Sequence, residues 1–161
     1  MADASKRAWL KERHRFSEWA GRSTLPKERS VEAPRLAGTE LRGWTLERAE
    51  RREVTGPVAP ARHTTFWRGE PPEAVVRIDV FVCTSVDAAH EYLIDALGEF
   101  ESNAVRRRAD APYGDVAFGT ETVALFARGN LVVVVRNVGR EVVPVADVAR
   151  AVDALVLGER Q

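Results

Sequence analysis

Residues 131–138 read LVVVVRNV and decide how this chain folds. Side chains alternate between the two faces of a β-strand, so the valines that follow Leu131 place apolar groups on both faces. A strand of this kind is typical of the centre of a sheet that is covered on both sides. Gly129 and Asn130 stand immediately before it, and this pair favours the positive φ angles of a tight hairpin turn. The stretch therefore predicts a central strand that is entered through a hairpin.

Further strands are predicted upstream of this one, and the RHTTFWRG of residues 62–69 is one of them. In the AVVRIDVFVC of residues 74–83, the apolar residues at every second position share one face. Residues 113–120 (YGDVAFGT) predict a shorter strand. Residues 41–54 (LRGWTLERAERREV) predict a long amphipathic edge strand, although the segment LERAERRE taken alone favours a helix. The strands are expected to pair in an antiparallel sheet.

Two amphipathic helices follow the two longest apolar strands. Residues 85–100 (SVDAAHEYLIDALGEF) and residues 143–158 (VPVADVARAVDALVLG) both place apolar side chains at helical spacing. Thr84 and Asp87 predict an N-terminal capping box for the first helix. Gly158 predicts the end of the second helix.

Short sequence matches suggest that the α+β domain contains an internal duplication. The FWRG of residues 66–69 is echoed by the FARG of residues 126–129, and each predicted helix contains the triplet DAL. Two pseudo-repeats of β-β-β-α order, roughly 40–100 and 112–158, are therefore expected. Chance matches also arise in a chain so rich in Arg and Ala. The resulting fold class is an α+β two-layer sandwich, in which an antiparallel sheet carries both helices on one face.

Residues 1–38 are expected to form an N-terminal amphipathic helix arm and a linker, and residues 39–161 the α+β domain. The segment RAWLKERHRFSEWAG (residues 7–21) combines aromatic and basic side chains and predicts a helix that ends near Gly21. Four uses of the arm compete: packing on its own domain, docking on a protein partner or a second copy of the chain, membrane-surface binding, and nucleic-acid binding.

The charge distribution decides between some of these uses. The 161 residues hold 24 Lys or Arg and 24 Asp or Glu, but all three lysines lie in residues 1–35, which carry nine basic against five acidic side chains. The rest of the chain is correspondingly acidic and would repel phosphate groups, which makes nucleic acid the weakest reading. Glu12 and Glu18 weaken a membrane-surface role. Packing of the arm on its own domain and docking on a protein partner or a second copy of the chain (a homo-oligomer) both remain open.

The remaining composition points to the cytoplasm. The single cysteine, Cys83, excludes an internal disulfide framework and fits a reducing compartment. The longest apolar run is too short to cross a bilayer. The N-terminus as written has no apolar signal core, although a leader peptide removed earlier would leave no trace.

A search for reactive groups gives little. His14, His63 and His90 have no metal-like spacing, and His90 is expected to be solvated on its helix. Cys83 is expected to be a small buried hydrophobe. No phosphate-binding glycine loop is present. Asp110 and Asp115 are interpreted as turn formers. No metal, no cofactor and no catalytic residue is expected.

Two functions therefore stand. The favoured one is a non-catalytic protein-interaction module whose N-terminal helix docks through Trp9, Phe16 and Trp19. The alternative is a small-ligand-binding protein or minor enzyme with a pocket on the open sheet face. Its expected lining residues are Trp44, His63, Trp67 and Arg68.

Overall fold

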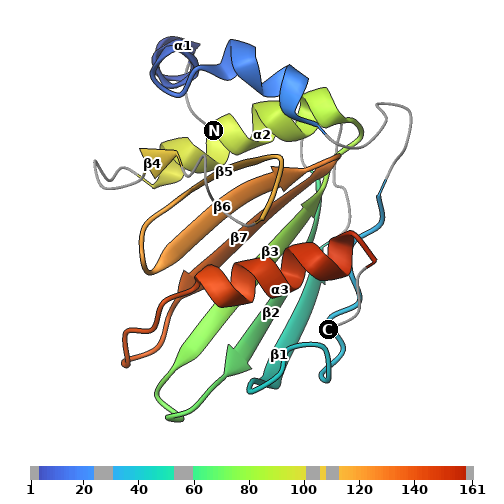
Figure 1. The fold of residues 1–161 in the computed structure, drawn as a ribbon, viewed down its shortest axis with the longest axis vertical. Helices are drawn as coiled ribbons and strands as arrows, with labels where there is room; N and C mark the ends of the chain where they lie inside the picture. Colours follow the sequence, from blue (N-terminus) through green and yellow to red (C-terminus); the bar gives the residue numbers. More distant parts are fainter. Residues whose placement is uncertain (1–3, 24–30, 53–59, 101–105, 108–112, 159–161) are drawn as a thin grey trace.

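The computed structural model of this chain describes residues 4–23, 31–52, 60–100, 106–107 and 113–158. Seven strands form one antiparallel sheet in the order β1-β2-β3-β7-β6-β5-β4 (Figure 1). The strands are β1 (Thr45–Arg52), β2 (Ala61–Arg68), β3 (Val75–Val82), β4 (Arg106–Arg107), β5 (Val116–Gly119), β6 (Val123–Arg128) and β7 (Leu131–Asn137). The predicted antiparallel α+β class is confirmed, as is the edge position of β1. The LVVVV strand lies at the centre, between β3 and β6.

The helices of the body begin and end close to the predicted limits. They are α2 (Val86–Glu99) and α3 (Ala146–Val156). Ser85, and not Thr84, caps α2, because its side chain accepts a hydrogen bond from the backbone N–H of Ala88. Gly158 follows α3 with a φ of 77°, a conformation that ends helices readily. The Gly129–Asn130 turn joins β6 to β7 as predicted.

The two helices cover opposite faces of the sheet, and the expectation that both lie on one face is wrong. Val132 and Val134 of β7 belong to the apolar cluster beneath α2, whereas Leu131, Val133 and Val135 belong to the cluster beneath α3. Figure 1 shows α3 crossing one side of the sheet. The architecture therefore has three layers, because β5, β6 and β7 are apolar on both faces and each face requires a cover.

The two halves repeat in chain order but not in space. The order β-β-β-α occurs in β1, β2, β3, α2 and again in β5, β6, β7, α3. However, β3 and β7 are antiparallel neighbours, the strand order is reversed about them, and the helices lie on opposite faces. A reversal of all three directions is an inversion, which no rotation of a chain can perform. The halves are thus not two copies related by a symmetry axis.

The N-terminal arm differs from the single helix that was predicted. Helix α1 (Ala4–Arg13) stops before Arg15, whose φ of 54° breaks the helix, and a 3₁₀-helix, η1 (Phe16–Arg22), follows. Beyond it, Val31, Ala33 and Leu36 pack against the cluster beneath α3, so this part of the expected linker belongs to the core. No helix of the described residues is long and apolar enough to cross a membrane.

Candidate functional site

The arm is held on its own domain by ion pairs with α2. The Arg7 guanidinium donates to the carboxylates of Asp95 and Glu91, and Lys11 Nζ lies 2.8 Å from Glu91 Oε1. Lys6 Nζ donates to the carbonyl oxygen of Gly98 at 2.9 Å. The basic side chains that suggested an external partner thus meet the acidic face of a helix in the same chain.

The three predicted aromatic anchors do not point the same way. Trp19 is 0% exposed and packs against Phe118, with a centroid distance of 5.5 Å, and its Nε1 donates to the carbonyl of His14. Phe16 is half-buried against Trp19. Trp9 alone among the three is largely free, at 55% exposed. Packing on the chain's own domain therefore occupies the main anchor.

Two histidines lie in this arm interface. His90 is 2% exposed and meets the Trp19 ring edge-on, which corrects its expected solvation. The ring of His14 meets that of Phe118 at a centroid distance of 4.9 Å. Burial, and secondarily the charge of Arg13, lowers the pKa of His14 from its ordinary value of 6.5.

The four residues predicted to line a ligand pocket are not brought together. Trp67 is 0% exposed within the cluster beneath α3, and Trp44 packs on Gly69. His63 is half-buried on β2, on the same side of the sheet as Trp67. Arg68 faces the opposite side, where it pairs with Glu47. A single pocket lined by all four residues is thus excluded by strand alternation.

The α2 side of β1, β2 and β3 carries a different set of side chains, which we call the arginine face. Helix α2 packs mainly over β6 and β7 and reaches β3 where Tyr92 contacts Phe81, so that on this side β1 and β2 carry no helix among the described elements. By strand register the face holds six arginines against three carboxylates. They are Arg48, Arg52, Arg62, Arg68, Arg77 and Arg136, with Glu47, Glu50 and Asp79. This surface is basic although the body as a whole is acidic.

One cross-strand row organises the arginine face. Arg48, Phe66, Arg77 and Arg136 stand directly opposite one another on β1, β2, β3 and β7. The guanidinium carbons of Arg48 and Arg77 lie 4.3 and 5.6 Å from the centroid of the Phe66 ring. That of Arg136 lies 5.8 Å from the centroid of Phe100. Each guanidinium of the row is therefore oriented by an aromatic ring.

A buried carboxylate anchors this row. Asp79 is 3% exposed at its side chain and lies in the next cross-strand row, where it accepts a hydrogen bond from the hydroxyl of Thr64. Its Oδ2 lies 2.9 Å from Arg77 Nε and 3.6 Å from Arg136 Nη2. The Asp79 carboxylate thus pairs with two guanidinium groups, and the cluster of Asp79, Arg77 and Arg136 keeps a net positive charge.

Two like-charge pairs stand on the arginine face. Arg77 is directly opposite Arg136, and Arg52 is directly opposite Arg62. Like charges at directly opposed positions destabilise a sheet. The Nε of Arg136 is also shielded from solvent without a hydrogen-bond partner among the described residues. Asp79 reduces the repulsion between Arg77 and Arg136, and the positive charge that remains makes this face a candidate for binding an anion.

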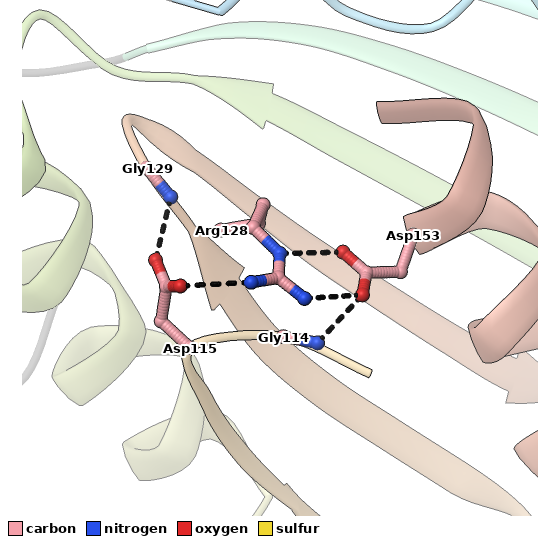
Figure 2. A network of polar contacts seen from close by, with 5 residues as sticks. All are labelled: Gly114, Asp115, Arg128, Gly129 and Asp153. Carbon is pink, nitrogen blue, oxygen red and sulfur yellow. Dashed lines mark hydrogen bonds and ion pairs between the residues drawn. The ribbon is translucent and has the colours of Figure 1, made fainter. Parts of the chain in front are cut away.

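A second polar cluster is structural. Arg128 donates hydrogen bonds of 2.9 and 2.7 Å to Asp153 and one of 3.0 Å to Asp115 (Figure 2). Asp115 also accepts from the N–H of Gly129, and Asp153 from that of Gly114. The network is buried, and both carboxylates accept hydrogen bonds from within the chain. Because Asp153 lies on α3 and Arg128 on β6, the network holds α3 on the sheet. Asp115 is thus a buried anchor as well as a turn residue, and Asp110 lies outside the described residues.

The other candidate reactive groups show no arrangement that would make them reactive. Burial raises the pKa of the Cys83 thiol to about 12, which keeps it protonated and unreactive. Within the described part of the chain, no three His, Cys, Asp or Glu side chains are grouped so that they could hold a metal ion. The sequence also contains a basic run, VRRR, at residues 105–108. Of this run the structure describes only the backbone of Arg106–Arg107, which forms strand β4 at the sheet edge.

Sequence reasoning missed the arginine face because its members come from four strands. One signal was present: Arg77 and Asp79 interrupt an otherwise apolar strand at alternate positions. That pattern marks a polar face on β3, but which residues stand beside it depends on the pairing of distant strands.

Known proteins offer no significant match to this chain. No protein-family model matches it, and no curated protein or solved structure is significantly similar to it. The function is therefore argued from the site alone.

Proposed function

We propose that this protein is a non-catalytic binding protein whose arginine face takes a ligand with two or more carboxylate or phosphate groups. The observation that carries the proposal is the row of Arg48, Arg77 and Arg136, whose guanidinium carbons lie 4.3, 5.6 and 5.8 Å from an aromatic ring centroid. A guanidinium group presents a planar fork of donors that matches carboxylate and phosphate oxygens. The ring contacts, together with the Asp79 ion pairs of Arg77 and Arg136, orient the forks before a ligand arrives, which lowers the entropy lost on binding.

The spacing of the row supports a ligand with more than one anionic group. Adjacent strands are about 4.8 Å apart, so the backbone positions of Arg48 and Arg136 are separated by roughly 14 Å across three strand intervals. A row of this length has room for more than one anionic group. The Phe66 ring already carries a guanidinium from each neighbouring strand, which leaves little ring surface on which a nucleobase could stack. This favours a polycarboxylate or polyphosphate over nucleic acid.

The test is calorimetric titration of the full chain with citrate and, separately, with inorganic pyrophosphate. At least one titrant should bind, and Arg77→Gln should weaken it about tenfold, the effect of losing one charge-assisted hydrogen bond. Arg48→Gln is the second variant, because Arg48 pairs with Glu50 and leaves the Asp79 anchor intact. Arg150→Gln, an exposed position on α3, is the matched control.

Three results decide the proposal. It is rejected if neither titrant binds, or if Arg150→Gln weakens binding as much as the two row variants do. A single-stranded oligonucleotide that binds the wild type and loses its affinity in Phe66→Ala would assign the face to nucleic acid instead. Binding of citrate without pyrophosphate, or the reverse, identifies the anionic group.

A second candidate function is docking of a protein partner or a second copy through the arm. The observation that favours it is Trp9, which is largely exposed and has the Arg13 guanidinium 5.2 Å from its ring centroid. Trp and Arg are typical of binding hot spots. Sedimentation velocity at rising protein concentration tests self-association, which Trp9→Ala should abolish without changing the melting temperature. Association that persists in Trp9→Ala contradicts this candidate.

We further infer that the protein works in the cytoplasm. The support is that Cys83 is the single cysteine of the sequence and is free, so the chain holds no internal disulfide of the kind that is frequent in oxidising compartments. Fractionation of the native cell checks this, with recovery of the protein outside the cytosolic fraction as the contrary result.

A further inference from the structure

The opposite side of β1, β2 and β3 contains a groove. Its volume is about 570 Å³, within the range of small-molecule sites. Residues 32–37 form one wall, and the ends of the three strands form the other. Arg51 and His63 are direct cross-strand neighbours on β1 and β2, and Val82 of β3 lies beside them. The groove and the arginine face are thus separated by the thickness of the sheet.

The wall formed by residues 32–37 is fixed at both ends. Before it, the side-chain oxygen of Asn130 accepts from the N–H of Val31 at 2.6 Å, and its nitrogen donates to the carbonyl of Val31 at 3.1 Å. After it, one Glu40 oxygen accepts from the N–H groups of Ala37, Gly38 and Thr39. The Asn130 contacts and the packing of Leu36 against the core hold the segment beside the strand ends, whereas the Glu40 bonds fix its local turn.

The residues of the groove divide by chemistry. Arg35, Arg51 and His63 supply cationic or hydrogen-bonding groups, against one carboxylate from Glu32. Leu36 and Val82 supply apolar surface and are partly buried against the core. The groove therefore combines a positively charged lining with an apolar patch.

We infer that this groove binds a small amphipathic anion, a molecule with an apolar body and one carboxylate or sulfonate group. The apolar body contacts Leu36 and Val82, and the anionic group accepts hydrogen bonds from Arg51 and His63. This site is independent of the arginine face, because strand alternation places the two sets of side chains on opposite sides of the sheet. A molecule with a single anionic group would suit the groove, whereas the arginine face requires several.

The test uses the fluorescent sulfonate 1-anilinonaphthalene-8-sulfonate with the full native chain at neutral pH. The dye should brighten on binding, and octanoate should displace it whereas octanol should not, because octanol lacks the anionic group. Arg51→Gln should weaken dye binding about tenfold. Ala61→Phe, which places a ring in the groove, should abolish it, and Arg150→Gln at an exposed position of α3 outside the groove should leave it unchanged.

Each alternative outcome overturns the inference. The inference is wrong if the native chain does not bind the dye. It is also wrong if Arg51→Gln and Ala61→Phe bind the dye as well as the native chain does, because the groove is then not the site. Displacement by octanol as efficient as by octanoate shows that no anion is recognised. Near-ultraviolet circular dichroism of every variant confirms that the dye reports on folded protein, since partly folded states also bind it.

Discussion

Arg128 of β6 and Asp153 of α3 form two parallel hydrogen bonds of 2.9 and 2.7 Å across the boundary between sheet and helix. The Asp153 bond raises the pKa of Arg128, so the guanidinium is charged at every working pH. Arg128 belongs to the second FxRG stretch and Asp153 to the second DAL triplet. The corresponding residues of the first half, Arg68 and Asp95, make different contacts. Arg68 pairs with Glu47, and Asp95 receives Arg7 of the arm. Similar letters thus serve different contacts in the two halves.

The first prediction concerns this clamp. Asp153→Ala leaves the Arg128 guanidinium buried with fewer partners, so the free energy of unfolding should fall by about 3 kcal/mol. Urea denaturation measures it. Asp147→Ala on the exposed side of α3 is the control, and its surface pair with Arg150 should be worth less than about 1 kcal/mol. Equal losses in the two variants would show that the buried network does not clamp the helix.

The second prediction separates the two tryptophans of the arm. Trp19→Ala should lower the free energy of unfolding by about 3–5 kcal/mol, because it removes a fully buried ring from the core. Trp9→Ala should change it by less than about 0.5 kcal/mol, because the ring is largely in solvent. Urea denaturation followed by circular dichroism compares both. A stable Trp19→Ala protein would mean that the arm does not dock as described.

The third prediction is a pH dependence that arises at His14. Burial and the nearby Arg13 lower its pKa below the ordinary 6.5, so folding favours the neutral ring. The contribution of His14 is complete above pH 6.5 and is lost as the pH falls from there through the folded-state pKa. Stability should therefore drop less steeply between about pH 7 and pH 5 in His14→Gln than in the wild type. Parallel urea-derived curves would refute this assignment.

At lower pH a second group of the arm interface adds to this loss. Burial alone would raise the pKa of Glu91, but the hydrogen bonds and charges of Lys11 and Arg7 outweigh it and lower the pKa below 4.5. Its stabilising effect is present above pH 4.5 and disappears as the pH falls through the lowered value. Glu91→Gln should remove that part of the acid transition while leaving the step due to His14.

The fourth prediction concerns Cys83. Because burial raises its thiol pKa to about 12, the native protein should not react with Ellman's reagent at pH 8, and the unfolded chain in urea should release one equivalent per chain. The absorbance of the released thiolate gives the count. Rapid reaction of the native protein would show that the thiol is accessible and activated.

Part of the fold was predictable because its signals are local. Helices α2 and α3 follow from apolar spacing within single segments. The hairpin follows from the pair Gly129 and Asn130, and Gly129 has the positive φ, 55°, that such a turn requires. The two-sided apolar strand at residues 131–138 already indicated a cover on each face. The placement of both helices on one face was wrong because it followed an assumed duplication instead of that strand.

The arm shows the same division. Its aromatic and basic composition is visible in the sequence, but whether Trp19 and Arg7 meet another molecule or their own domain depends on where α2 lies. Arg15 alone turns the chain after α1, and this change of direction carries Trp19 toward Phe118. A helical wheel drawn through residues 7–21 cannot include such a break.

The sequence by itself determined helices α2 and α3, the apolar strands and the central place of β7, because each depends on periodicity within one segment. Only the tertiary structure decided which faces the helices cover and which side chains share a site. Arg48, Phe66, Arg77 and Arg136 stand in one row through the pairing of four strands. A one-residue change in any of these registers would move a member to the other face, and no local pattern specifies the pairing between such distant segments.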